Sequence, residues 1–173
     1  MKKIRLANEA AARREGRELP ADPAADVVEK MIEIGRPSRL KGAGFYEYDE
    51  DGRRQGLWPG LAETFPTREE QLPFEDVKER MLFIEALETA RCFEEGVVTS
   101  AAAANIGSIM GIGFPANTGG AAQFMTGYVG ADGEIGLDAF IKRADELAAA
   151  YGDRFAPTSY LREMAAKGES FPA

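Results

Sequence analysis

Side chains able to do nucleophilic or metal chemistry are scarce in this chain of 173 residues, which has one cysteine and no histidine. The missing histidine excludes a Ser–His–Asp triad, a Cys–His pair and histidine-based zinc sites, and a single cysteine excludes a four-cysteine zinc site. The cysteine, Cys92, lies in an apolar-rich segment where no general base can be named beside it. We interpret Cys92 as a core or half-buried thiol, not as a nucleophile.

Carboxylates are the abundant ionisable groups, with 29 aspartates and glutamates against 21 lysines and arginines. Most must lie on solvated helix faces, since charged side chains are rarely buried, and the sequence singles out no general-acid pair. The net charge of −8 disfavours nucleic-acid binding because no basic stripe is available to displace phosphate counterions. Core filling explains four methionines better than metal binding does: Met81, Met110, Met125 and Met164.

A glycine-rich loop suggests nucleotide binding at first, but it lacks the parts that such a loop needs. Gly111 and Gly113 are followed by Phe114-Pro115-Ala116, without a third glycine. The segment follows a predicted helix, whereas the dinucleotide fingerprint follows a β-strand, and Pro115 removes an amide that a pyrophosphate would need. Gly42-Ala43-Gly44 fails the same check. We therefore expect no catalytic, cofactor-binding or metal-binding residue in this chain.

Packing alone does not explain the length of this loop, a ten-residue connection with four glycines between two predicted helices. Such a loop allows a close approach, either by a neighbouring domain or by a ligand. The domain contact is the favoured interpretation, because Asn117 and Thr118 are the loop's only polar side chains. The candidate interface loop consists of Gly111, Gly113, Phe114, Pro115, Asn117, Thr118, Gly119 and Gly120.

The elements that must position these residues fall into three parts, of which residues 1–40 are the first. This part is a predicted helical segment. One helix, from Lys2 to Glu15, ends at the breakers Gly16 and Pro20. A second begins at Asp22-Pro23, which suit the N-cap and the first helical position.

Residues 41–72 form a predicted connector, rich in glycine and aromatic residues. Aromatic and polar residues alternate ahead of Asp51-Gly52, a pair typical of a hairpin turn. Because a free linker gains little from exposed aromatic rings, we expect Phe45, Tyr46, Tyr48 and Trp58 to pack on a neighbour.

Residues 73–173 are predicted to form a compact helical domain, and the fold class is predicted to be all-α. Pro73 opens a long helix whose apolar positions recur every three or four residues: Val77, Met81, Ile84, Leu87 and Ala90. Ser100 and Thr158 are predicted N-caps of later helices. The cleanest amphipathic stripe extends from Leu137 to Tyr151.

Several stretches, in the same order, resemble the C-terminal helical domain of 3-hydroxyacyl-CoA dehydrogenases. The resemblance is to the second, duplicated copy in multifunctional fatty-acid oxidation proteins, preceded by the end of the first copy. It depends on GRPSRLKGAGFYEY (35–48), RCFEEGVV (91–98), GIGFP (111–115) with Gly119-Gly120, YGDRF (151–155) and residues 161–168. The resemblance implies a helical bundle of the 6-phosphogluconate dehydrogenase C-terminal-domain type.

In such proteins an enoyl-CoA hydratase domain comes first, then a Rossmann domain that binds NAD, then the two helical copies. The reaction oxidises a 3-hydroxyacyl-CoA with NAD⁺, and a histidine–glutamate pair in the Rossmann domain takes the hydroxyl proton. These residues have no counterpart here, and Leu87 stands where the catalytically engaged copy usually has an asparagine. The resemblance thus implies a cytoplasmic C-terminal part of the dehydrogenase, inactive alone, which provides a domain or dimer-like interface while NAD and acyl-CoA bind elsewhere.

Two interpretations of the partners remain open. In the first, the chain acts with hydratase and Rossmann domains of the same or a neighbouring polypeptide, with thiolase as a further partner. In the second, it is a free-standing helical interaction module, homodimeric or docking on a dehydrogenase or thiolase, without catalysis. We expect self-association, and no membrane span, because no apolar run approaches the ~18–20 residues that a span needs.

Overall fold

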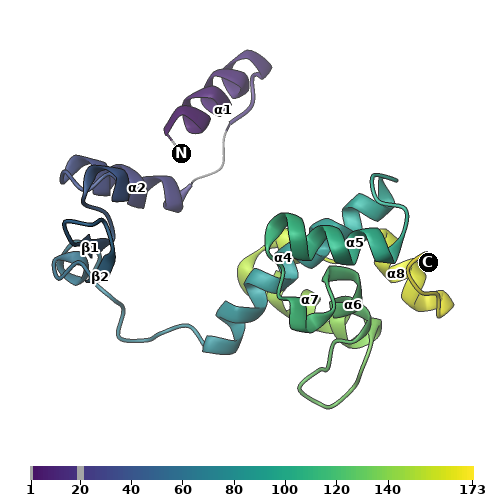
Figure 1. Cartoon of the computed structure of the whole chain (residues 1–173). Coiled ribbons are helices and arrows are strands. Elements are labelled where there is room, and N and C mark those ends of the chain that lie inside the picture. Colours follow the sequence, from purple (N-terminus) through teal and green to yellow (C-terminus); the bar gives the residue numbers. More distant parts are fainter. Residues whose placement is uncertain (1, 19–21) are drawn as a thin grey trace. The chain divides into compact units, whose positions relative to one another are not determined.

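Helices account for most of the structure, a computed structural model that describes residues 2–18 and 22–173. The all-α class is confirmed, since the only sheet in these residues is a two-stranded hairpin. The chain divides into two compact units, 1–71 and 72–173 (Figure 1). Pro20, the predicted helix breaker, lies outside the described residues. None of the helices in the described part is long and apolar enough to cross a bilayer.

Local capping signals set the helices of the first unit. Helix α1 spans Lys2–Glu15 and helix α2 spans Pro23–Glu33. The Asp22 side chain accepts a hydrogen bond of 3.1 Å from the Ala25 amide, so Asp22 is the N-cap that the sequence predicts. Gly35, with a φ of 79°, takes the left-handed conformation just after α2 ends.

After α2 the chain folds around Arg36. The short 3₁₀ turn η1 (Arg39–Lys41) precedes an antiparallel hairpin of β1 (Tyr46–Tyr48) and β2 (Arg54–Leu57), and α3 (Leu61–Thr64) follows. The Arg36 guanidinium donates hydrogen bonds to the carbonyl oxygens of Gly44 (2.8 Å) and Tyr46 (3.1 Å). It also lies 4.5 Å from the centre of the Trp58 ring. One arginine therefore holds the aromatic connector within its own unit.

The second unit begins with the long helix α4 (Phe74–Glu94). It continues through α5 (Ala101–Gly107), the π-helical turn η2 (Ser108–Ile112), the 3₁₀ turn η3 (Ala116–Thr118), α6 (Ala121–Thr126), α7 (Leu137–Tyr151), the 3₁₀ turn η4 (Asp153–Phe155) and α8 (Ser159–Lys167). Ser100 Oγ accepts a hydrogen bond from the Ala103 amide. Thr158 Oγ1 accepts one from the Leu161 amide, so both predicted caps are confirmed.

Aromatic rings form the centre of the second unit. They come mainly from α4, α6 and α7, which lie together in Figure 1. Phe83 of α4 stacks on Phe140 of α7, with ring centres 4.4 Å apart. Tyr128 and Phe124 approach the edge or face of Phe83 at right angles, with centres 5.1 and 5.7 Å away. Such pairs add roughly 0.5–1.5 kcal/mol each beyond the burial of their area. These ring contacts determine which side of α4, α6 and α7 faces the core.

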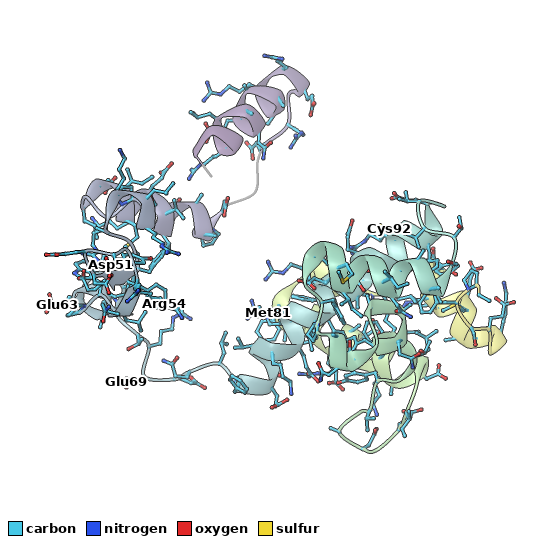
Figure 2. All side chains as sticks on the ribbon, in the orientation of Figure 1. Asp51, Arg54, Glu63, Glu69, Met81 and Cys92 are labelled. Carbon is cyan, nitrogen blue, oxygen red and sulfur yellow. The ribbon has the colours of Figure 1, made fainter. Side chains whose placement is uncertain are left out.

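The start of α4 departs from the predicted apolar stripe. The stripe places Val77 and Met81 in the core, but they are 39% and 67% exposed, so this part of the prediction is wrong (Met81 is labelled in Figure 2). The inward positions of these turns are Asp76 and Glu79, whose carboxylates pair with Arg143 of α7. The spacing of apolar residues does not distinguish a carboxylate that is paired inside the fold from one that is exposed to solvent.

The four methionines divide between core and surface. Met125 and Met164 are 0% and 3% exposed, as core filling predicts. Met81 and Met110 are 67% and 80% exposed, and for these two the core-filling prediction is wrong. Their exposure leaves apolar surface uncovered on α4 and on η2.

Candidate functional site

The candidate interface loop is partly built into its own unit. Phe114 is only 2% exposed, and its ring packs edge-on against Phe124 with the centres 5.6 Å apart. Thr118 Oγ1 donates a hydrogen bond to the Pro115 carbonyl oxygen (2.7 Å) and accepts one from the Gly120 amide (3.3 Å). The path of the loop is therefore determined by contacts inside the unit.

Gly120 shows why the loop must end in glycine. Its φ is 104°, and a Cβ atom at this position would lie 2.5 Å from the Cα of Asn105. Because carbon atoms cannot approach a backbone so closely, α5 and the start of α6 can touch only if residue 120 is glycine. This glycine serves the fold of the unit and is not free for a partner.

Two side chains, one on α5 and one on η2, cap the start of α6, a role that the sequence analysis missed. Ser108 Oγ accepts a hydrogen bond from the Ala121 amide and donates one to the Asn105 carbonyl oxygen, both at 3.0 Å. Asn105 Oδ1 accepts a hydrogen bond from the Gln123 amide at 3.0 Å. The sequence did contain a signal for these caps. Gly120 occupies the N-cap of α6 and has no side chain, so the first amides of α6 need hydrogen-bond acceptors from elsewhere.

The other members of the loop lie at or near the surface. Exposed residues are Gly111, Gly113, Pro115, Asn117 and Gly119, and Thr118 is half-buried. They offer backbone, small apolar groups and one amide side chain, with no charged or strongly nucleophilic group. Contact between this loop and a neighbouring domain stays a prediction, and it concerns only these outward residues.

An apolar surface continues from the loop along the exposed side of α5 and η2. This surface, the α5 surface, consists of Ala102, Ala103, Ile106, Gly107, Met110, Gly111 and Ile112. Its large side chains, Ile106, Met110 and Ile112, are 65%, 80% and 60% exposed. No charged residue occurs between Glu95 and Asp132, although 29% of the chain is charged. Exposed apolar surface without charge is typical of a protein–protein contact.

A polar cluster around Arg143 joins α4 to α7. Arg143 Nε lies 2.6 Å from Glu79 Oε2, and its Nη2 lies 2.5 Å from Asp76 Oδ1. The Tyr128 hydroxyl donates a hydrogen bond to Glu79 (2.7 Å). The Tyr151 hydroxyl donates one to Asp76 (2.5 Å). Each of the two carboxylates therefore receives hydrogen bonds from an arginine and from a tyrosine.

The pKa shifts in this cluster favour charged Asp76 and Arg143 and neutral Tyr128 and Tyr151 near neutral pH. Hydrogen bonds from Tyr151 and then Arg143 lower the pKa of Asp76. Burial and the hydrogen bond to Glu79 raise the pKa of Tyr128, and the hydrogen bond to Asp76 raises the pKa of Tyr151. Burial opposes the charge on Arg143, but its carboxylate partners raise its pKa overall. The cluster thus forms a clamp of charge-assisted hydrogen bonds between α4 and α7.

A pocket of about 490 Å³ lies beside this cluster. Asp132, Lys142 and Glu146 supply part of its charged lining. Lys142 pairs with Asp132 at 2.5 Å, and Glu146 pairs with Arg143 at 3.0 Å. A charged ligand would have to compete with these internal pairs, so the pocket offers no ready-made binding charge.

Leu87 and Cys92 of α4, which the sequence analysis weighed for a catalytic part, both have structural positions. Leu87 is fully buried and belongs to the apolar core. Cys92 is half-buried, in agreement with its interpretation as a structural thiol (labelled in Figure 2). Within residues 2–18 and 22–173, no three histidine, cysteine or acidic side chains are grouped to hold a metal ion.

Comparison with known proteins finds a relative that is much longer than this chain. The chain is similar to the fatty acid oxidation complex subunit alpha of Pseudomonas savastanoi pv. phaseolicola (strain 1448A / Race 6). The two are 35% identical over 156 residues, which cover 87% of this chain and 20% of the relative. This chain therefore spans about one fifth of the length of that protein. No family model matches the chain.

Proposed function

Because the chain is similar over most of its length to part of a fatty acid oxidation complex subunit alpha, we propose that it is the C-terminal part of a 3-hydroxyacyl-CoA dehydrogenase of fatty-acid β-oxidation. Its role in that enzyme is to provide a helical interface, not the catalytic centre. NAD and the acyl-CoA substrate bind to hydratase and Rossmann domains of the same or a neighbouring polypeptide. Thiolase is a further partner of the assembled enzyme.

The α5 surface is the observation that carries the interface role. Ile106, Met110 and Ile112 are all at least 60% exposed, and the surrounding segment has no charge. Exposure of apolar side chains to water costs a free energy of about 25 cal/mol for each Å² of apolar area. A protein partner that covers the surface removes that penalty.

The chemistry of the chain supports a role outside catalysis. Alcohol oxidation by NAD⁺ needs a base for the hydroxyl proton, and the chain has no histidine to act as one. Asp76 and Glu79 are engaged in the clamp around Arg143. Leu87, where the catalytically engaged copy of the resembled domain usually has an asparagine, is enclosed in the core. The base and the cofactor must therefore come from other domains.

A chimera tests the proposal directly. The matched segment of the Pseudomonas relative is replaced by this chain, and oxidation of a 3-hydroxyacyl-CoA is followed through NADH absorbance. We expect the chimera to oxidise the substrate, and the isolated chain to produce no NADH above the blank. The unmodified relative, assayed in parallel, controls for the assay.

Two results would contradict the proposal. One is a folded chimera without dehydrogenase activity while the unmodified relative is active. The other is measurable NAD⁺ reduction by the isolated chain, which would place a catalytic centre within it.

The second candidate function is a free-standing interaction module, homodimeric or docking on a dehydrogenase or thiolase. The same α5 surface favours this role, since it needs a partner but not a particular enzyme. An inactive chimera, together with stable self-association of the isolated chain, would favour the module over the dehydrogenase part.

A further inference from the structure

A small cavity of about 250 Å³ lies in the first unit, between α2 and the connector that follows it. Most of its lining is apolar or aromatic: Val28, Met31, Pro37, Phe45, Tyr46 and Tyr48. Two arginines, a serine and a glycine complete the lining: Arg36, Arg39, Ser38 and Gly44. A concave apolar surface with a few polar groups is typical of a small-molecule site.

Contacts inside the unit fix the walls of this cavity. Ser38 and Ala43 pair as an antiparallel bridge, which closes the turn that carries Arg39. The Arg36 guanidinium donates hydrogen bonds to the carbonyl oxygens of Gly44 and Tyr46, at 2.8 and 3.1 Å. Walls that are already ordered lose little conformational entropy when a ligand enters.

The charge of the lining is positive, although the whole chain has a net charge of −8. Two arginines and no acidic residue occur among the described residues that line the cavity. Arg36 pairs with Glu47 at 3.2 Å. Arg39 is exposed and forms no ion pair within the described part of the chain, and the Ser38 hydroxyl leaves η1 uncapped. The cavity therefore has a cation and a hydroxyl available for an anion.

The 490 Å³ pocket of the second unit differs in this respect. Its cations, Lys142 and Arg143, are paired with carboxylates of the same lining. Positive charge that is free to meet a ligand is thus a feature of the smaller cavity.

Size and lining limit the anion that fits. Sites for drug-sized ligands have volumes of about 300–1,000 Å³, so a cavity of 250 Å³ is too small for a dinucleotide or a coenzyme A. Inorganic phosphate gains nothing from apolar walls. The planar fork of a guanidinium matches a carboxylate, and the apolar lining suits a hydrocarbon body.

We propose that this cavity binds a small monocarboxylate with an apolar body, such as hexanoate. The hydrocarbon packs against Val28, Met31 and Phe45, and the carboxylate accepts hydrogen bonds from the Arg39 guanidinium and the Ser38 hydroxyl. This site goes beyond the interface role and does not depend on it, because every residue that lines it belongs to the first unit.

Calorimetric titration of the full chain with hexanoate tests the site. A dissociation constant of about 0.1–1 mM is expected for a ligand of this size. Hexan-1-ol, which lacks the charge, and acetate, which lacks the hydrocarbon, should each bind at least about tenfold more weakly. The fluorescence of Trp58, the only tryptophan of the chain, gives a second readout, since its ring centre lies 4.5 Å from the guanidinium of Arg36.

The length of the hydrocarbon should matter up to the size of the cavity. From butanoate to hexanoate the affinity should rise about fourfold for each added methylene group. Val28→Phe narrows the cavity and should reduce this gain. Thermal melts confirm that the variant is folded.

Two arginine variants test the carboxylate contact. Arg39→Ala should weaken hexanoate binding about tenfold or more and leave the binding of hexan-1-ol unchanged. Arg53→Ala is the matched control, because Arg53 is equally exposed but does not line the cavity. The control should bind hexanoate with the wild-type dissociation constant.

Each outcome of the test has a defined meaning. Absence of hexanoate binding at ten times the expected dissociation constant overturns the proposal, and so does hexanoate binding that Arg39→Ala leaves unchanged. Equal affinity for hexanoate and inorganic phosphate would reduce the cavity to a nonspecific anion site and also overturn it. No dehydrogenase activity is measured, so failure here leaves the chimera result untouched, and an inactive chimera leaves this site untouched.

Discussion

Gly120 and Asn105 hold α6 against α5 at a separation that only glycine permits, because a Cβ on residue 120 would lie 2.5 Å from the Asn105 Cα. This contact, with the caps from Asn105 and Ser108, positions α6 so that its Phe124 ring joins the aromatic core. The glycines of this segment are of two kinds. The fold requires Gly120, whereas Gly107 and Gly111 are exposed and a Cβ atom on either would meet nothing within 4 Å among the described residues.

Gly120→Ala should destabilise the unit strongly. The new Cβ clashes with backbone, and a φ of 104° is strained for alanine, which together should lower the free energy of unfolding by about 2–4 kcal/mol. Gly133→Ala is the matched control, since its φ is 84° but its Cβ would meet nothing within 4 Å. The control should lose only about 1–2 kcal/mol, for the backbone strain alone. Urea denaturation of both variants measures the difference, and equal losses would contradict the close contact.

Arg143→Met should weaken the attachment of α4 to α7. The change leaves the carboxylates of Asp76 and Glu79 without their cation in a half-buried site, and we expect a loss of about 1–3 kcal/mol in unfolding free energy. Arg162→Met removes an arginine that pairs with Asp145 at the surface, and it should lose less than about 1 kcal/mol. Chemical denaturation compares the two, and an Arg143 effect no larger than the Arg162 effect would argue against the clamp.

Tyr151→Phe should change how stability depends on pH. The Tyr151 hydrogen bond lowers the pKa of Asp76 in the folded state, below its ordinary value of 3.8. The resulting stability is present above pH 3.8 and is lost as the pH falls through the lower, folded value. Without the hydroxyl the folded pKa moves back up, so the variant should be less stable at neutral pH.

The gap between wild type and Tyr151→Phe should therefore narrow as the solution becomes more acidic than the ordinary pKa of Asp76. Denaturation curves at a series of pH values measure this gap. Asp76→Asn in the same series removes the titrating group and should show a weaker acid dependence. A gap of constant size at every pH would mean that the hydrogen bond does not act through Asp76.

Leu87→Asn tests whether this position accepts the asparagine that the resemblance leads us to expect in a catalytically engaged copy. Leu87 is fully buried in the apolar core, so an amide there has no room for water and is expected to lower the unfolding free energy by about 3–5 kcal/mol. Leu87→Met, which keeps the volume and polarity, should lose less than about 1.5 kcal/mol. Thermal melts rank the two variants, and a Leu87→Asn chain as stable as Leu87→Met would contradict a purely structural position.

Sequence signals predicted the start and stop of several helices correctly. Asp22, Ser100 and Thr158 each accept the capping hydrogen bond that their positions suggested. Gly35 and Gly168 follow the ends of α2 and α8 in the left-handed conformation. A cap or a stop depends on residues within one helical turn, so the local sequence carries the necessary information.

Burial within those helices was predicted less well. Val77 and Met81 are exposed, while Asp76 and Glu79 lie inward because Arg143, which is 67 residues after Asp76, comes to meet them. A periodic stripe identifies one side of a helix as apolar, but only the arrangement of distant helices decides which part of that side is covered.

The candidate site shows the same division. The sequence alone determined that the chain has no histidine, no dinucleotide fingerprint and an unusual glycine loop. The tertiary structure decided that Phe114 and Gly120 turn into the fold, while Ile106, Met110 and Gly107 stay open. The physical reason is that a residue's type limits the chemistry it can perform, whereas its exposure depends on which segments, remote in sequence, pack over it.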